Sequence, residues 1–366
     1  MSSFPDTIPD VSQVASPAVL VYPEIIQQNI DLMIKMAGDP ARLRPHIKTH
    51  KIAEIVRMQM KSGITKFKCA TMAEAELLAK EKAERILLAI QPVGPEVERY
   101  VELSRQYPDS AFSVVLDNAG VIRQLNEACE KQSTRFGAFL DLNVGMNRTG
   151  VKPGTEAIAR YKMLHEMPRL DIRGLHVYDG HINDPGIDDR TKRADSAYAL
   201  VENFITQLNT MGFAPPVVVA GGTPTFPIHA KRDGVELGPG TTLLWDFGMV
   251  ERYADLEFQC AAFLLMRVIS KPDDGLVCFD LGHKAVAAEN PHPRVLIQGL
   301  EDATFVSQSE EHLVAETDRW HQIEVGDVFL GISRHICPTM ALYDDVYVVE
   351  DNTITGSWEV AARHRY

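Results

Sequence analysis

Short apolar strands alternate with longer amphipathic stretches over the first 250 residues, and this alternation constrains the fold more than any other feature. A strand followed by a helix, repeated along a chain, predicts a parallel sheet. Eight such units within about 250 residues match a (β/α)8 TIM-type barrel, whose active site lies at the carboxyl ends of its strands. The predicted strands are LRPHIK (43–48), KFKCA (66–70), RILLAI (85–90), AFSVVLD (111–117), FGAFLDL (136–142), GLHVYD (174–179), PVVVAGG (216–222) and GVELGPG (234–240).

After Glu251 the pattern changes to β-rich runs such as FQCAAFLLMRVIS, GLVCFDLG and DDVYVVE, which predict a separate β domain. We therefore expect an α/β protein with a barrel domain over residues 1–250 and a C-terminal β domain over residues 251–366. The segment SPAVLVY (16–22) is also strand-like, so the first 20 or so residues fit either domain.

The charge and the apolar pattern exclude several kinds of partner. A formal net charge of −13 repels nucleic acids and anionic membrane surfaces. The most apolar stretch, residues 258–269, is interrupted by Gln259 and Arg267 and falls short of the ~20 residues that a membrane span needs. The N-terminus lacks the basic start and apolar run of a signal peptide, and five scattered cysteines are typical of reduced thiols. We expect a cytoplasmic protein that binds neither nucleic acid nor membrane.

The motif RPHIKTHK (44–51) concentrates basic and imidazole side chains more than any other segment of the chain. In an extended segment, period-two alternation places Arg44, His46, Lys48 and His50 on one face. Inside a barrel, partial desolvation and neighbouring cations favour the neutral amine of a lysine, which is the form that attacks a carbonyl. The alternative is a solvated basic edge strand.

Two glycine-rich segments follow the last two predicted strands. Backbone amides and hydroxyls at such positions can hold a phosphate, although tight turns have the same composition. Arg148, after the fifth predicted strand, could supply a cation to a phenolate or carboxylate, or could be an ordinary surface arginine. The candidate phosphate contacts are Gly221, Gly222, Thr223, Gly240 and Thr241.

Two further motifs contain histidine. In HVYDGH, Tyr178 could form an aromatic wall and His181 a base with a near-neutral pKa, or His181 could be an ordinary loop histidine. In the predicted β domain, His335 and Cys337 are spaced i, i+2, so an extended chain would point both side chains the same way. Two protein ligands leave positions for water or substrate, as in a catalytic metal site. The alternative is a buried cysteine beside an incidental histidine.

Together these motifs resemble the fold-type III pyridoxal-phosphate (PLP) enzymes related to alanine racemase, in particular the D-threonine aldolase and D-serine dehydratase branch. The resemblance runs in order through SPAVLVY, RPHIKTHK, ATMAEAELLA, GMNRTGV, VYDGH, GGTPTF, PGTTLLWD, SEEH and HICPT. RPHIKTHK and HICPT are its most specific parts.

The resemblance implies a role for each candidate residue. Lys48 matches the lysine that forms a Schiff base with PLP, and Arg148 matches an arginine near the phenolic oxygen of the cofactor. Tyr178 and His181 resemble active-site residues, and the glycine-rich segments resemble the phosphate contacts. Gly238 departs from the arginine of alanine racemases, so the resemblance assigns no partner to the pyridine nitrogen.

His335 and Cys337 match the two metal ligands of this branch. The second ligand is aspartate in some of the aldolases and cysteine in the dehydratases, so Cys337 does not decide the activity. Among zinc, manganese and magnesium, a thiolate favours zinc.

The resemblance therefore predicts a PLP- and divalent-metal-dependent lyase, a homodimer, that cleaves a D-β-hydroxy-α-amino acid. A D-threonine aldolase, which forms glycine and an aldehyde, is the first expectation. A dehydratase of D-serine or of 3-hydroxyaspartate is the alternative, because the same residues serve both reactions. A non-enzymatic PLP-binding protein is a more distant alternative. The long β domain and its His335–Cys337 (HxC) pair disfavour it.

Overall fold

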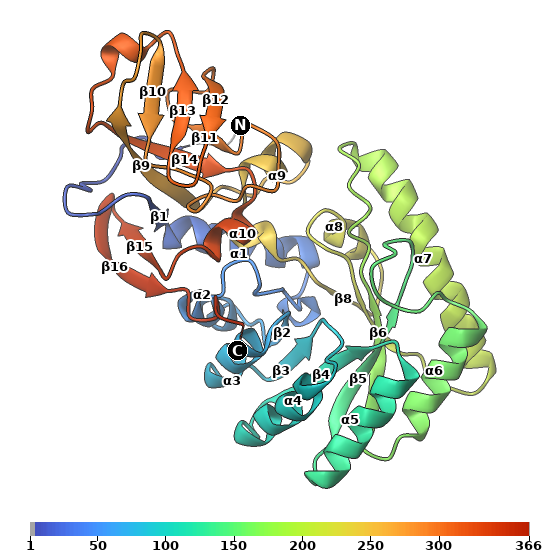
Figure 1. Ribbon diagram of the computed structural model, residues 1–366. Helices are drawn as coiled ribbons and strands as arrows, with labels where there is room; N and C mark the ends of the chain where they lie inside the picture. Colours follow the sequence, from blue (N-terminus) through green and yellow to red (C-terminus); the bar gives the residue numbers. More distant parts are fainter. Residues whose placement is uncertain (1–3, 366) are drawn as a thin grey trace. The chain divides into compact units, whose positions relative to one another are not determined.

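A computed structural model describes residues 4–365, and these divide into two compact units, each assembled from separate segments of the chain (Figure 1). The barrel unit contains residues 33–48, 56–240 and 364–365, and the β unit contains residues 4–32, 49–55 and 241–363. The chain therefore passes between the units several times. The domain boundary expected between residues 250 and 251 stays a prediction.

The barrel unit is built on a parallel sheet in the order β2-β3-β4-β5-β6-β7-β8, as the strand–helix alternation predicts. Its strands are β2 (Lys66–Cys69), β3 (Arg85–Leu88), β4 (Ala111–Leu116), β5 (Phe136–Leu142), β6 (Leu170–Val177), β7 (Val217–Ala220) and β8 (Val235–Leu237). The helices that connect them are α3 (Met72–Lys80), α4 (Pro95–Gln106), α5 (Ala119–Lys131), α6 (Thr155–Glu166), α7 (Ile187–Thr210) and α8 (Phe226–His229). Figure 1 shows α4 to α7 along the outer face of this sheet.

The predicted first strand, 43–48, is not a regular strand, but it closes the barrel. On one side Arg44 N donates to Leu237 O at 2.8 Å, next to β8. On the other side Ile47 N donates to Lys68 O at 3.0 Å, on β2. The segment is irregular because Pro45 has no N–H to donate and because a turn begins at Ile47. It thus joins the two edge strands of the sheet and completes the expected barrel.

An apolar layer fills part of the barrel interior. Leu87, Val115, Phe139 and Val219 come from four different strands and form a cluster in which no member is more than 2% exposed. Asp141 follows Phe139 at i+2 on β5, so both side chains point to the same face of the sheet. Polar groups therefore lie inside the barrel near the carboxyl ends of its strands.

The β unit contains a mixed sheet in the order β12-β13-β10-β9-β1-β15-β16, with β14 pairing with β9 and β11 pairing with β14. Strand β1 (Ala18–Val21) pairs antiparallel with β9 and parallel with β15, so the strand-like segment near the N-terminus belongs to this sheet. The other strands are β9 (Ala262–Ser270), β10 (Leu276–Phe279), β11 (Val295–Ile297), β12 (Thr304–Gln308), β13 (Leu313–Glu316), β14 (Val328–Ser333), β15 (Asp345–Glu350) and β16 (Thr353–Glu359).

The remaining helices are short, apart from the first. They are α1 (Pro23–Ala37), α2 (Ala53–Lys61), α9 (Phe247–Arg252) and α10 (Ile336–Met340), with 3-10 turns η1 (Pro40–Arg42), η2 (Thr241–Leu243) and η3 (Trp320–Gln322). Across residues 4–365, no helix has the length and apolar character needed to cross a membrane.

Candidate active site

The basic motif divides at the turn that begins at Ile47. Arg44 and His50 are buried, whereas Lys48 is exposed. The expected common face of four basic residues is therefore wrong: the chain leaves the extended conformation at the turn, and His50 belongs to the β unit. The desolvation that we expected around Lys48 is likewise not seen at this side chain.

The desolvated lysine of the barrel is Lys68 on β2, which the sequence reasoning missed. The residue is 2% exposed, and the pKa of its amine is lowered to about 7. Burial is the largest cause, and the charges of Lys48 and Arg44 add to it against the opposing effect of two buried carboxylates, Asp179 and Asp141. The sequence feature that could have indicated Lys68 is the alternation in KFKC, which places Lys66 and Lys68 on one face of a predicted barrel strand.

The loops after β5 and β6 bring together three of the predicted residues. The guanidinium carbon of Arg148 lies 4.7 Å from the centre of the Tyr178 ring, a cation–π arrangement. The imidazole of His181 packs against the same β5 loop, since a Cβ on Gly145 would be 2.6 Å from His181 Nε2. Arg148, Tyr178 and His181 thus form one group at the carboxyl ends of neighbouring strands.

His181 has the properties of a neutral base. Burial lowers the pKa of its imidazole, Asp179 opposes this effect and Arg193 adds to it, with a net shift downward. Its Nδ1 atom is buried and has no hydrogen-bond partner among the described residues. Such an unpaired buried nitrogen is costly unless a ligand or water reaches it.

The glycine-rich loops after β7 and β8 are joined by a hydrogen bond, because Gly240 N donates to Thr223 Oγ1 at 3.1 Å. Gly221 has a φ of +79°, a backbone conformation that favours glycine. Gly222 approaches the Tyr178 ring so closely that a Cβ at 222 would lie 3.1 Å from it. The predicted phosphate contacts of the barrel unit therefore adjoin Tyr178. Thr241 belongs to the β unit instead.

A buried carboxylate that the sequence reasoning overlooked fixes these loops. Asp179 accepts hydrogen bonds from Thr225 Oγ1 and from His229 Nε2, both at 2.7 Å. Burial opposes its ionisation, but His229 and Thr225 outweigh this effect and keep the pKa of Asp179 below its ordinary value. Asp179 follows Tyr178 in the chain, so these bonds tie the loop after β6 to the segment after β7. Its only sequence signal was an acidic residue just beyond a buried strand.

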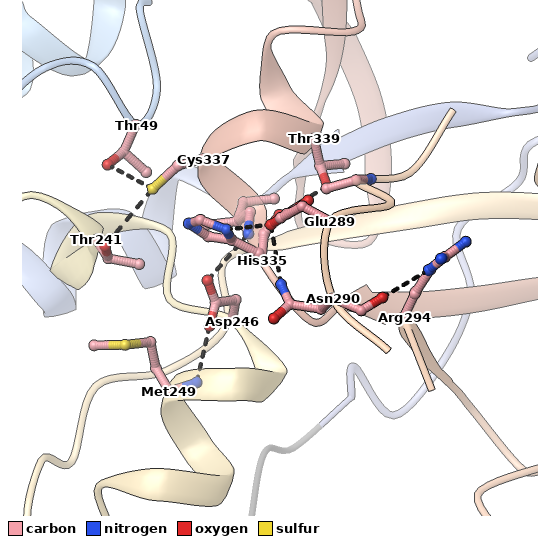
Figure 2. A network of polar contacts seen from close by, with 12 residues as sticks. Thr49, Thr241, Asp246, Met249, Glu289, Asn290, Arg294, His335, Cys337 and Thr339 are labelled. Carbon is pink, nitrogen blue, oxygen red and sulfur yellow. Dashed lines mark hydrogen bonds and ion pairs between the residues drawn. The ribbon is translucent and has the colours of Figure 1, made fainter. Parts of the chain in front are cut away.

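The HxC residues lie in the β unit, at the start of α10 (Figure 2). His335 is the N-cap residue of this helix and Cys337 is in its first turn, so the expected extended chain is wrong. The helix begins there because Asp246 Oδ2 accepts a hydrogen bond from Ile336 N at 3.0 Å. The sulfur of Cys337 lies 3.2 Å from Thr49 Oγ1 and 3.7 Å from Thr241 Oγ1.

His335 and Cys337 interact, and each shifts the pKa of the other. Burial opposes ionisation of Cys337, but hydrogen bonding to His335 and the charge of His335 lower the pKa of the thiol below its ordinary value. Burial lowers the pKa of His335, but Cys337 and Glu289 more than offset this and raise it to about 9. Glu289 Oε1 lies 2.5 Å from His335 Nδ1. Within residues 4–365, His, Cys, Asp and Glu side chains form no group of three or more suited to holding a metal.

Comparison with known proteins places these features in a family. Residues 22–244 match the family described as alanine racemase, N-terminal domain, and residues 261–349 match a putative serine dehydratase domain. The chain is 27% identical to a D-threonine aldolase of Arthrobacter sp. over 327 residues, which cover 88% of this chain and 85% of that protein. It is 25% identical over 370 residues to a 3-hydroxy-D-aspartate aldolase of Paracoccus denitrificans, with coverage of 97% and 93%.

A solved structure has the same fold over nearly the whole chain. The crystal structure of D-threonine aldolase from Filomicrobium marinum superposes with a TM-score of 0.87 at 25% sequence identity, and covers 98% of this chain and 99% of that one. The barrel matches the first family model, which alone spans more than half of the sequence. The chain belongs to the alanine racemase N-terminal domain family, within the fold-type III PLP enzymes.

Proposed function

We propose that this protein is a PLP- and divalent-metal-dependent lyase of the D-threonine aldolase type, which cleaves a D-β-hydroxy-α-amino acid to glycine and an aldehyde. The observation that carries the proposal is the His335–Cys337 pair, which adds a metal-binding chemistry to an alanine racemase-like barrel. Its similarity to two aldolases of β-hydroxy amino acids supports the choice of reaction. As the family implies, we also propose that the protein is a homodimer.

The residues of the barrel unit fit PLP. Lys48 and Arg148 are exposed cations that make no ion pair within the described chain, so they can neutralise an anionic cofactor. Gly221, Gly222, Thr223 and Gly240 would contact the phosphate, and we also assign Thr241, the next residue, to this group. Lys48 would hold the cofactor covalently, with Arg148 near its phenolic oxygen and Tyr178 against its ring. Bound PLP supplies an electron sink for the bond that breaks at Cα.

The residues of the β unit fit one divalent metal. A thiolate and an imidazole are donors that suit zinc, and carboxylate contact to the second imidazole nitrogen is typical of metal-binding histidines. His335 and Cys337 would hold the ion, which would supply Lewis acidity toward a hydroxyl group. Manganese and magnesium remain alternatives, because one thiolate does not decide between them. Thr49, which contacts Cys337, directly follows Lys48 in the sequence.

His181 would act as the general base of the reaction. Its neutral imidazole can accept a proton, and its buried Nδ1 lacks a partner among the described residues. Removal of the proton from the β-hydroxyl of the substrate allows the Cα–Cβ bond to break and the aldehyde to leave. Arg148 and Tyr178, which adjoin His181, would keep the substrate and cofactor oriented toward this base.

Dehydration of D-serine or of a 3-hydroxyaspartate is a second candidate reaction. The match of residues 261–349 to a putative serine dehydratase domain favours it. In that reaction Lys48 would remove the proton from Cα and the β-hydroxyl would leave.

Product analysis decides between the two reactions. Protein supplied with PLP and either manganese or zinc is incubated separately with D-threonine, D-serine and D-threo-3-hydroxyaspartate, with L-threonine as the stereochemical control. Glycine and acetaldehyde from D-threonine support the aldolase. Pyruvate and ammonia from D-serine, without glycine from any substrate, would instead establish the dehydratase. If none of the three D-amino acids reacts, the proposed function is contradicted.

A further inference from the structure

Two lysines on β2 differ in their partners. Lys66 Nζ is paired with Glu236 Oε1 at 2.5 Å. Lys68 makes no hydrogen bond or ion pair through its amine with any residue in the described part of the chain, although the residue is only 2% exposed. Burial removes most of the hydration of this amine, and the attraction of Asp179 and Asp141 offsets only part of that cost, since the pKa of Lys68 is lowered overall. Lys68 therefore has a cost in the free protein that Lys66 does not have.

The space around Lys68 is fitted to its amine. A Cβ built on Gly238 would lie 2.1 Å from Lys68 Nζ and 2.7 Å from its Cε, which is closer than real atoms approach. The same Cβ would lie 3.0 Å from Gly221 O, so the amine reaches the place where the loops after β7 and β8 come together. Glycine at 238 thus makes room for the end of a lysine from another strand.

The charges around Lys68 indicate what it could bind. Lys48 and Arg44 repel its ammonium form, while Asp141 and Asp179 attract it. Both carboxylates already have partners, since Asp141 pairs with His176 Nδ1 at 2.7 Å and Asp179 with His229. Among the described residues these carboxylates bond His176, His229 and Thr225 and not the Lys68 amine, so this amine can serve an acceptor atom of a ligand. The proposed phosphate contacts Gly221 and Gly240 lie in the loops that the amine reaches.

We propose that Lys68 is a second, non-covalent cofactor-binding lysine, whose amine hydrogen bonds an acceptor atom of the PLP attached at Lys48. This inference rests on the proposed function. The acceptor is either the pyridine nitrogen or a phosphate oxygen, both of which accept a hydrogen bond from an amine. The role explains why a costly buried lysine and a glycine that accommodates it occur together.

The test uses Lys68→Met, which keeps most of the side-chain volume and removes the amine. Loss of a hydrogen bond to a charged group should weaken PLP binding by about tenfold to a hundredfold. The matched control is Lys66→Met, on the same strand and face, which should leave PLP affinity within twofold of wild type. The dissociation constants are measured by titrating cofactor-free protein and following absorbance, so no activity is needed.

Thermal unfolding separates this role from a structural one. Removal of an unpaired buried amine should leave the melting temperature of cofactor-free Lys68→Met unchanged or higher, because the variant loses a desolvation cost. A structural role predicts a lower melting temperature with unchanged PLP affinity, and that result would overturn the inference.

Gly238→Ala tests the fit between the two residues. The added methyl group should displace the Lys68 amine and weaken PLP binding by a similar factor. In a Lys68→Ala background the methyl meets no lysine but still lies 3.0 Å from Gly221 O, so Gly238→Ala should cause a smaller loss there than in the wild type, as expected for coupled sites. Full additivity of the two losses would contradict the proposed contact.

Pyridoxal distinguishes the two acceptor atoms. If Lys68 contacts the ring nitrogen, Lys68→Met should weaken the binding of pyridoxal and of PLP by similar factors. If Lys68 contacts the phosphate, only the binding of PLP should be weakened. Either result supports the inference. Equal PLP affinity of Lys68→Met and wild type would refute it and leave the proposed function intact. Failure of wild type itself to bind PLP would instead refute the proposed function.

Discussion

Glu289 Oε1 lies 2.5 Å from Nδ1 of His335, so this carboxylate engages one imidazole nitrogen, and Nε2 is the nitrogen that would bind a metal (Figure 2). Loss of such an outer carboxylate usually lowers metal affinity by about 10–100-fold. We expect Glu289→Gln to weaken zinc binding by that factor in a calorimetric titration. Glu251→Gln is the control, because Glu251 pairs with the neighbouring Arg334 and not with His335. Equal affinities of the two variants would contradict the assignment.

Lys48 should carry the cofactor. Borohydride treatment of the PLP-loaded protein should fix the cofactor on the peptide that contains Lys48, as read by mass spectrometry. Lys48→Ala should lose both this label and the visible absorbance of the bound cofactor, because no amine remains at that position to attach it. Lys51, from the same motif, has its Nζ 3.4 Å from Ala362 O and should stay unlabelled. A label on Lys51 or Lys68 would show that another lysine is the attachment site.

His181→Asn should lower turnover by about 10²–10⁴-fold, which is typical for loss of a general base. PLP should still bind, because Lys48 and the glycine-rich loops are unchanged. Glycine formation and cofactor absorbance are measured on the same samples, with His165→Asn, a change on α6, as the control. Unaltered turnover of the His181 variant would remove this residue from the mechanism.

Chelation should remove activity without unfolding the protein. A site with two protein ligands contributes less to folding than a closed structural site, so the melting temperature and cofactor absorbance should persist in a chelator. Added zinc or manganese should restore turnover, and Cys337→Ala should need a higher metal concentration for the same rescue. Full activity in the chelator would favour a metal-independent reaction.

His50 should make stability depend on pH. Burial lowers the pKa of His50 to about 3, whereas the unfolded chain has a value near 6.5. The unfolded state therefore binds more protons between these values, and stability falls as pH decreases from 6.5 toward 3, by about 1.4 kcal/mol per pH unit from this residue. His50→Asn keeps an acceptor for Ile52 N, which His50 Nδ1 bonds at 3.2 Å. Urea unfolding between pH 4 and pH 7 should show a shallower slope for this variant, and parallel slopes would contradict the assignment.

The barrel could be predicted because its strands are short apolar runs separated by helical stretches, and each of those signals is local. The start of α10 could not be predicted, because it depends on a hydrogen bond from Ile336 N to Asp246, which lies 90 residues earlier in the chain. For Lys68, the alternation with Lys66 was visible in the sequence, but its burial and the matching glycine at 238 come from contacts across the barrel. Sequence motifs thus indicated which loops matter, and three-dimensional packing decides which polar groups lack partners.

The position of β1 between β9 and β15 has a consequence for synthesis of the chain. Residues 18–21 are made early, whereas their partners begin at Ala262 and Asp345. At about 5–20 residues per second, β1 waits roughly ten seconds to a minute for the strands that will cover it. All four of its residues are apolar and are buried in the finished sheet. In the nascent chain this apolar strand therefore lacks its first neighbour until β9 is made, and it lacks its second neighbour until β15 follows.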